Sequence, residues 1–251
     1  MRYAAVSILP YDVALISRHL NDIQIQVPIF IFRRKWYMDS KTKKITTTAM
    51  LCAVAYVVVV VERIPVVLFL KYDPKDIIIT LGGLIWGPMT SFIVSVIVSL
   101  IEMVTISENG VLGCIMNIIS TCSFACTASV IYKKKRTLSG VVTGLVAGSL
   151  MMVLVMLLWN YLITPIYMGY PREAVAELLV PAFLPFNLLK AGLNAGFTFL
   201  LYKPITTALR KAGYISDSQN VQGRKPIGLW LFSEILVITC ILLILSFNGI
   251  I

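Results

Sequence analysis

The stretch PAFLPFNLLKAGLNAGFTFLL, residues 181–201, decides the fold class, because it is long and apolar enough to cross a lipid bilayer and yet carries a lysine. Inserting Lys190 would cost about 2.5–3.5 kcal/mol, so the side chain is expected to face a protein interior or a polar cavity. Asn187 lies three residues before it and Asn194 four residues after it. That spacing places all three side chains on one face of a helix, which predicts the wall of a binding site.

The rest of the chain has the same membrane character. Of its 251 residues, 58% are hydrophobic and 14% are charged, and the mean hydropathy is +0.87. A spanning helix needs about 20 residues, and the apolar segments that approach this length are 46–63, 76–86, 89–106, 111–132, 138–164, 181–202 and 227–247. The segment 76–86 is short, so it is expected to be tilted or to be covered by the loop before it. The sequence therefore predicts an all-α, polytopic transmembrane protein.

Lysine and arginine are concentrated in alternate connections between these helices. They dominate before the first helix, between the fourth and fifth, and after the sixth, whereas the other connections are neutral or acidic. This positive-inside pattern predicts that residues near 41, 134 and 210 are cytoplasmic. Topology thus explains the net charge of +10, and no nucleic-acid partner is predicted.

Composition divides the chain into four parts: an atypical extension at 1–37, a membrane domain at 38–211, a cytoplasmic linker at 212–226 and a further C-terminal helix at 227–251. Residues 33–35, Arg-Arg-Lys, can be encoded by a purine-rich ribosome-binding sequence, and Met38 opens a basic lead-in to the first helix. Two hypotheses stay open. Either translation starts at Met38 and residues 1–37 are an untranslated upstream stretch, or the extension is genuine.

Polar residues gather in the predicted outer half of the bilayer. Asn117 lies near the outer end of the fourth helix, Asn160 near that of the fifth, and Asn187 with Lys190 in the outer half of the sixth. Asparagine offers donors and acceptors, and lysine offers donors. Aromatic side chains in the same region add flat apolar surface: Trp159, Tyr161 and Phe186. This mixture is typical of a site for a neutral, hydroxyl-rich ligand with a planar ring, although an interhelical hydrogen bond explains Asn117 equally well.

Enzymatic chemistry has little support. The single histidine, His19, lies outside the predicted helices, and neither an intramembrane carboxylate pair nor a serine beside a base is apparent. The sequence contains no Walker-type phosphate loop. Cys122 and Cys126 share a helix face without converging metal ligands, so packing explains them and no metal or cofactor is predicted. Glu102, near the outer end of the third helix, is the candidate for ion coupling, and a self-sufficient secondary transporter using Glu102 remains an alternative.

Two further segments have an expected role. The outward loop at 64–75 is apolar although it meets water, which predicts either a lid that buries Leu68, Phe69 and Leu70 or an interfacial re-entrant segment. Ala49 and Ala53 lie four residues apart near the cytoplasmic end of the first helix. Small residues at that spacing let another helix approach closely.

Three segments resemble the substrate-binding S components of energy-coupling-factor (ECF) vitamin transporters, most closely the riboflavin-specific RibU type. They are FLKYDPKD at 69–76, GGLIWGP at 82–88 and LPFNLLK at 184–190. The resemblance covers about residues 41–210. It implies a six-helix membrane fold that binds riboflavin from outside and assembles with a transmembrane coupling subunit and two ABC-type ATPases.

The same resemblance implies roles for particular residues. Asn160, Asn187 and Lys190 would hold the flavin, and the first outer loop, with Leu70 and Lys71, would close the site. Ala49 and Ala53 would pack on the coupling subunit.

Two features depart from the family pattern. Residues 227–247 would form a seventh helix, and Glu102 is an acid where a riboflavin binder is expected to carry a neutral or basic residue. The expected ligand is riboflavin or a close flavin analogue, with another vitamin as the alternative.

Overall fold

The computed structural model describes residues 40–61, 64–67, 70–107, 110–169, 171–214 and 227–247. The chain forms two compact units, Met1–Lys43 and Lys44–Ile251. Of the first unit only residues 40–43, the beginning of a helix, are described, so the predicted extension at 1–37 and the start at Met38 lie outside the described residues. The second unit contains the membrane domain.

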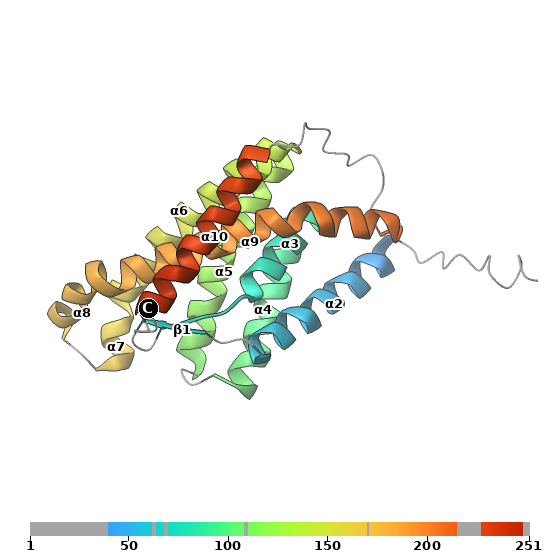
Figure 1. Cartoon of the computed structure of the whole chain (residues 1–251). Coiled ribbons are helices and arrows are strands. Elements are labelled where there is room, and N and C mark those ends of the chain that lie inside the picture. The colour runs from blue at the N-terminus through green and yellow to red at the C-terminus, as the bar shows by residue number, and fades with distance from the viewer. Residues whose placement is uncertain are drawn as a thin grey trace, which may run out of the picture. The chain divides into compact units, whose positions relative to one another are not determined.

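The described elements are almost all helices (Figure 1). In chain order they are α2 (Ser40–Val61), β1 (Ile64–Val67), β2 (Leu70–Tyr72), α3 (Lys75–Trp86), α4 (Pro88–Thr105), α5 (Gly110–Lys134), α6 (Leu138–Leu162), α7 (Thr164–Met168), α8 (Arg172–Leu178), the π-helix η1 (Leu179–Phe183), α9 (Leu184–Lys211) and α10 (Ile227–Phe247). Six helical stretches among the described residues are long and apolar enough to cross a membrane. The predicted all-α transmembrane fold is confirmed, and each of the seven predicted segments is a helix.

The short helix α3 lies in the core of the bundle. It has 12 residues and is packed against α4, α5 and α9. Ile77, Leu81 and Leu84 join one apolar cluster with α5 and α6, and Ile79 joins another with α2 and α4. A helix of this length spans about 18 Å at 1.5 Å per residue, which is less than the roughly 30 Å of a hydrocarbon core. At least one of its ends is therefore expected to lie within the depth of the membrane, and Lys75 and Asp76 at its start are the buried charges that such a position would enclose.

A small antiparallel hairpin precedes α3 where the sequence predicted an apolar loop. Ile64 pairs with Tyr72 and Pro65 with Lys71. Val66 and Tyr72 are buried in an apolar cluster with residues of α9. The hairpin thus packs against α9 and α10, and the two alternatives for the short helix, tilt or cover by the preceding loop, stay predictions. Leu68 and Phe69, which the lid hypothesis buries, lie outside the described residues.

Glycines at a spacing of four residues bring α6 against α5. A Cβ atom at Gly144 would lie 2.7 Å from the carbonyl oxygen of Ala128, and one at Gly148 would lie 2.6 Å from that of Phe124. A backbone oxygen cannot rotate away as a flexible side chain can. Close backbone approach through small residues is a main source of helix association in lipid, so this row fixes the distance between α5 and α6.

Replacing Gly148 with valine is expected to lower the free energy of unfolding by about 1–3 kcal/mol, because the added methyl groups overpack against backbone. Thermal unfolding of the purified protein in detergent measures this effect. Val146→Leu on the exposed face of the same helix is the control and should leave the melting temperature unchanged. Equal melting temperatures for Gly148→Val and the wild-type protein would contradict the packing described here.

The C-terminal helix α10 packs along α9, again through glycines. A Cβ atom at Gly196 would lie 2.6 Å from Val237 Cγ2, and one at Gly192 would lie 3.1 Å from Cys240 Sγ. Val237 and Cys240 belong to the apolar cluster that includes Tyr72 of the hairpin. The predicted seventh long helix is thus confirmed, and it supports both the hairpin and α9.

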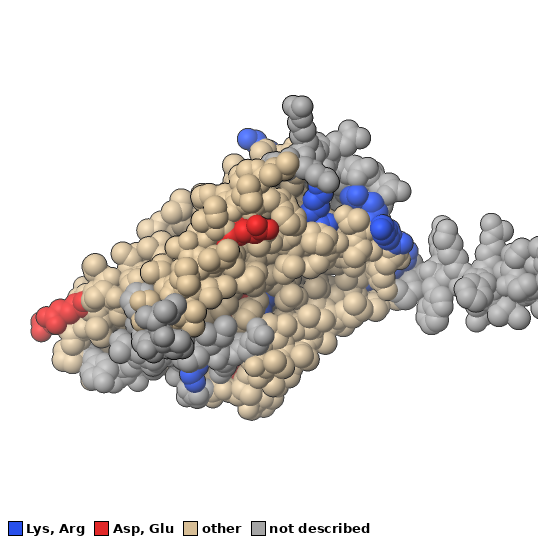
Figure 2. Space-filling model, viewed as in Figure 1, with Lys and Arg blue, Asp and Glu red and all other residues tan. Residues whose placement is uncertain are grey.

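Charged side chains are distributed unevenly over the second unit. On the face in Figure 2, lysine and arginine side chains gather toward the end at which α9 terminates, whereas acidic side chains of α8 lie toward the other end. Lys44 near the start of α2 and Arg136 between α5 and α6 line one cavity. Two of the connections that the positive-inside pattern assigns to the same side therefore meet at one end of the bundle.

Candidate binding site

The first turn of α3 places two charged side chains inside the bundle. Lys75 and Asp76 are 1% and 0% exposed. Pro74 precedes the helix, and Asp76 lies in its first turn, where a carboxylate is stabilised by the positive end of the helix dipole. Because α3 is short, this turn meets side chains of α4, α5 and α9.

Asp76 is the centre of a network that joins four elements. Its Oδ2 lies 3.2 Å from Lys190 Nζ of α9 and accepts a hydrogen bond of 3.2 Å from Asn194 Nδ2. Its Oδ1 accepts a hydrogen bond of 2.6 Å from Thr121 Oγ1 of α5. Tyr72 OH of β2 donates to Asn194 Oδ1 at 2.9 Å. The hairpin, α3, α5 and α9 are therefore held together around one carboxylate.

A second buried ion pair lies beside the first. Lys75 Nζ is 2.6 and 2.7 Å from the two carboxylate oxygens of Glu102 in α4. Asn117 Nδ2 of α5 donates to Glu102 Oε2 at 3.0 Å. Lys190 also interacts electrostatically with Glu102 and Asp73, which links the two pairs into one charged cluster.

Charge compensation explains how these groups persist within the membrane depth. A buried ion is costly unless it is paired and hydrogen-bonded, and each carboxylate here has a lysine and an amide or hydroxyl donor. Lys75 and Asp76 count toward the neutral charge balance of the connection before α3 in the sequence, yet the structure buries both side chains. Asp76 and Glu102 are two buried carboxylates, each paired with its own lysine, and Glu102 is 1% exposed.

Asn187 and Asn160 differ from these residues because their amides keep unused hydrogen-bonding capacity. Asn187 is 1% exposed, and its Nδ2 donates to the carbonyl oxygen of Phe183 at 2.8 Å. Its Oδ1 is buried with no hydrogen-bond partner among the described residues. Asn160 accepts from Thr164 Oγ1 at 3.1 Å through its Oδ1, and within the described part of the chain its Nδ2 makes no hydrogen bond. A buried unsatisfied amide costs about 1–3 kcal/mol, so these atoms are suited to a ligand.

The backbone before Asn187 is irregular. The π-helix Leu179–Phe183 leads directly into α9, with Pro185 in the first turn. Such π segments occur frequently at functional sites. The irregular turn thus ends two residues before Pro185 and four residues before Asn187.

The other side chains that the sequence assigned to the site differ in burial. Lys71 is an exposed residue of β2, and Leu70 begins the same strand, with its side chain outside the described set. Phe186 is buried at 7% exposed, whereas Tyr161 is 40% exposed. Trp159 packs against the main apolar cluster.

The predicted partner-contact residues lie on the surface of α2. Ala49 and Ala53 are both exposed, whereas Ala55 and Val59 on another face of the helix are fully buried. A second helix therefore has access to the two alanines.

Sequence reasoning missed Lys75, Asp76, Thr121 and Tyr72. The signal that identifies the first two is the length of the segment 76–86, because a helix too short to span must begin inside the membrane. Thr121 and Tyr72 have no comparable signal, since a threonine in a helix and a tyrosine in a loop are both common.

The chain is similar to a known family of membrane proteins and to individual members of it. The family model described as "ECF transporter, substrate-specific component" matches residues 43–202, so α10 lies beyond the match. The riboflavin transporter RibU of Staphylococcus aureus is 28% identical over 187 residues, covering 71% of this chain and 98% of that protein. The riboflavin transporter FmnP of Bacillus subtilis is 28% identical over 163 residues, covering 60% and 85%.

A solved structure has the same fold. It is described as "Structure and mechanism of the S component of a bacterial ECF transporter" and superposes with a TM-score of 0.58 at 27% identity. The superposition covers 68% of this chain and 99% of the other. The described helices thus include a complete counterpart of that protein, with additional residues outside it.

Proposed function

Because the chain belongs to the substrate-specific (S) components of ECF transporters, a family of multi-pass membrane proteins, we propose that it binds riboflavin or a close flavin analogue from outside the cell. Binding would serve ATP-driven uptake. The residues proposed to hold the ligand are Asn160, Asn187 and Lys190, with Leu70 and Lys71 at the closing loop.

The observation that carries this proposal is the unused polar capacity of those three side chains. Among the residues that the structure describes, Asn187 Oδ1 is a buried acceptor without a partner and Asn160 Nδ2 makes no hydrogen bond. Lys190 has three N–H donors, and its Nζ lies 3.2 Å from Asp76 Oδ2. A ribityl chain and an isoalloxazine ring edge carry hydroxyls, carbonyls and an imide N–H, which complement such a set. The names of the relatives support the same ligand.

The acid at Glu102 is compatible with a neutral ligand. Its charge is compensated by Lys75 at 2.6 Å and by the amide of Asn117. The carboxylate therefore does not require a cationic substrate, and the departure from the expected neutral or basic residue is balanced within the protein.

Energy for transport is proposed to come from partner subunits. The sequence has no Walker-type phosphate loop, and the family associates with ECF module components. We propose a transmembrane coupling subunit with two ABC-type ATPases as partners, with Ala49 and Ala53 as the contact surface. Residues near 41, 134 and 210 would then face the cytoplasm, where those ATPases act.

Reconstitution into liposomes tests the transport mode. Uptake of labelled riboflavin should require the ECF module and internal ATP, and an uncoupler should leave the uptake unchanged. Uptake by this chain alone that collapses with an uncoupler would instead support the alternative, a secondary transporter using Glu102.

Asn117 provides a second test, because the structure gives it a partner within the protein. Asn117→Ala is expected to lower the free energy of unfolding by about 1.5–3 kcal/mol, the usual contribution of a hydrogen bond to a charged group. The Kd for riboflavin should change little. A large rise in Kd without loss of thermal stability would show that Asn117 contacts the ligand.

A further inference from the structure

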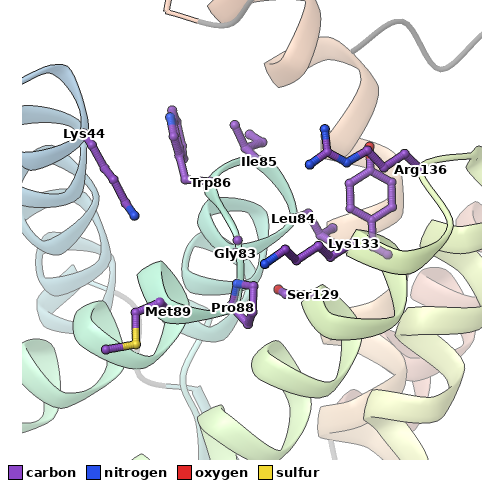
Figure 3. A pocket seen from close by; sticks show the side chains of 12 residues that line it. Lys44, Gly83, Leu84, Ile85, Trp86, Pro88, Met89, Ser129, Lys133 and Arg136 are labelled. Atoms are coloured by element: carbon purple, nitrogen blue, oxygen red, sulfur yellow. The ribbon is translucent and has the colours of Figure 1, made fainter. Parts of the chain in front are cut away.

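A second candidate binding region lies at the other end of α3 from the Asp76 network. A cavity of about 360 Å³ is bounded by the start of α2, the turn between α3 and α4, and the end of α5 (Figure 3). Its lining includes Lys44, Lys133 and Arg136 but no acidic residue. It shares no lining residue with the site proposed for the flavin.

Three separate elements supply these positive charges. Lys44 comes from α2, Lys133 from α5, and Arg136 from the connection between α5 and α6. Figure 3 shows the ammonium group of Lys133 and the guanidinium group of Arg136 directed into the cavity, with Lys44 extending toward it from the other side. None of the three forms an ion pair with a carboxylate among the described residues. A bound anion would relieve their mutual repulsion.

The beginning of α4 adds to the positive potential. Gly87, Pro88 and Met89 line the cavity, and α4 is an 18-residue helix whose first turn is Pro88 onward. Pro88 has no N–H, and the N–H of Thr90 donates to the carbonyl oxygen of Gly87 at 3.0 Å, so within this turn the backbone N–H of Met89 is the one with no acceptor among the described residues. The helix dipole favours an anion there. Gly87 has φ 103°, a left-handed conformation that lets the chain turn sharply between α3 and α4.

The depth of the cavity points to the source of the anion. Candidate membrane spans begin at Thr42 and Pro88 and end at Lys134, so the cavity lies where hydrocarbon gives way to lipid headgroups. Trp86 and Tyr132 also line it, and these residue types are enriched at that interface. Basic residues at this level are attracted to anionic lipids.

We propose that this cavity binds a phosphate group, supplied by the headgroup of an anionic phospholipid. Lys133 and Arg136 contact the phosphate oxygens, Met89 at the start of α4 donates its backbone N–H, and Lys44 closes the cavity from α2. A bound lipid thereby ties α2 to α5.

Native mass spectrometry tests this proposal. The full-length protein would be equilibrated with mixed micelles containing phosphatidylglycerol or phosphatidylcholine, and retained lipid would be counted. We expect selective retention of phosphatidylglycerol, with roughly 30-fold weaker binding in Lys133→Gln/Arg136→Gln, the effect of removing two basic residues at a membrane surface. The control Lys203→Gln/Lys211→Gln removes the same charge from α9 and should retain the lipid.

Two results would overturn the proposal, and a third would identify where the bound phosphate group comes from. Equal lipid retention by the wild-type protein and both double variants would overturn it. Loss of assembly with the coupling subunit in Lys133→Gln/Arg136→Gln, with lipid retention unchanged, would overturn it and assign the cavity to that subunit. Inorganic phosphate that stabilises delipidated wild-type protein, but not this variant, and displaces the lipid would confirm a phosphate site with free phosphate as a competing source.

Discussion

Replacing Lys190 with alanine is expected to abolish measurable high-affinity riboflavin binding. Losing a hydrogen bond from a charged donor to the ligand costs about 1.5–3 kcal/mol in binding, which is roughly a 10- to 150-fold rise in Kd. The same change leaves Asp76 buried without its lysine, 3.2 Å away in the wild-type protein. Unfolding should therefore also become easier by about 3–5 kcal/mol.

A double variant separates these two effects. In Lys190→Met/Asp76→Asn both charges are absent, so most of the lost stability should return, whereas riboflavin binding should stay weak. Lys203→Met, further along the same helix and partly exposed, is the matched control and should bind normally. Thermal unfolding and fluorescence titration measure the two quantities. Full recovery of binding in the double variant would show that Lys190 only stabilises the fold.

Replacing Ala49 and Ala53 together with leucine is expected to abolish uptake while riboflavin binding is retained. Both alanines are exposed on α2, so the isolated protein can accommodate the larger side chains. A closely packed partner helix cannot, because contact through small residues depends on short backbone distances. Uptake by cells that express the ECF module measures the first effect, and titration of the purified variant measures the second.

The control for this experiment uses another face of the same helix. Val54 and Val61 are 46% and 72% exposed, and Val54→Leu/Val61→Leu adds comparable bulk there. This variant should transport normally. Normal uptake by the alanine variant, or a parallel loss of binding and uptake, would contradict the proposed contact with the coupling subunit.

The long helices were predictable because membrane insertion imposes a strong and local requirement. Each needs a continuous apolar run of about 20 residues. Such a run is as clear in α10 as in the long helices within the family match at 43–202. Lys190 was predictable for the same reason, since a charge inside such a run is conspicuous. Asn187 followed from its position one helical turn away.

Other features depend on tertiary structure. Lys75 and Asp76 stand just before an apolar run. The local sequence looks the same whether such charges are exposed to water or buried in ion pairs, here Lys75 with Glu102 and Asp76 with Lys190. The glycine row at Gly144 and Gly148 becomes meaningful only when α5 is known to be the neighbour of α6. The strands of the hairpin have four and three residues, too few for a periodic pattern.

The central claim is that this S component binds riboflavin, and a titration of the purified full-length protein with riboflavin tests it most directly. Quenching of flavin and tryptophan fluorescence would report binding. The account predicts saturable, tight binding at one site per chain that Lys190→Ala removes. Absence of saturable riboflavin binding by demonstrably folded protein, with tight binding of a different vitamin instead, would contradict it.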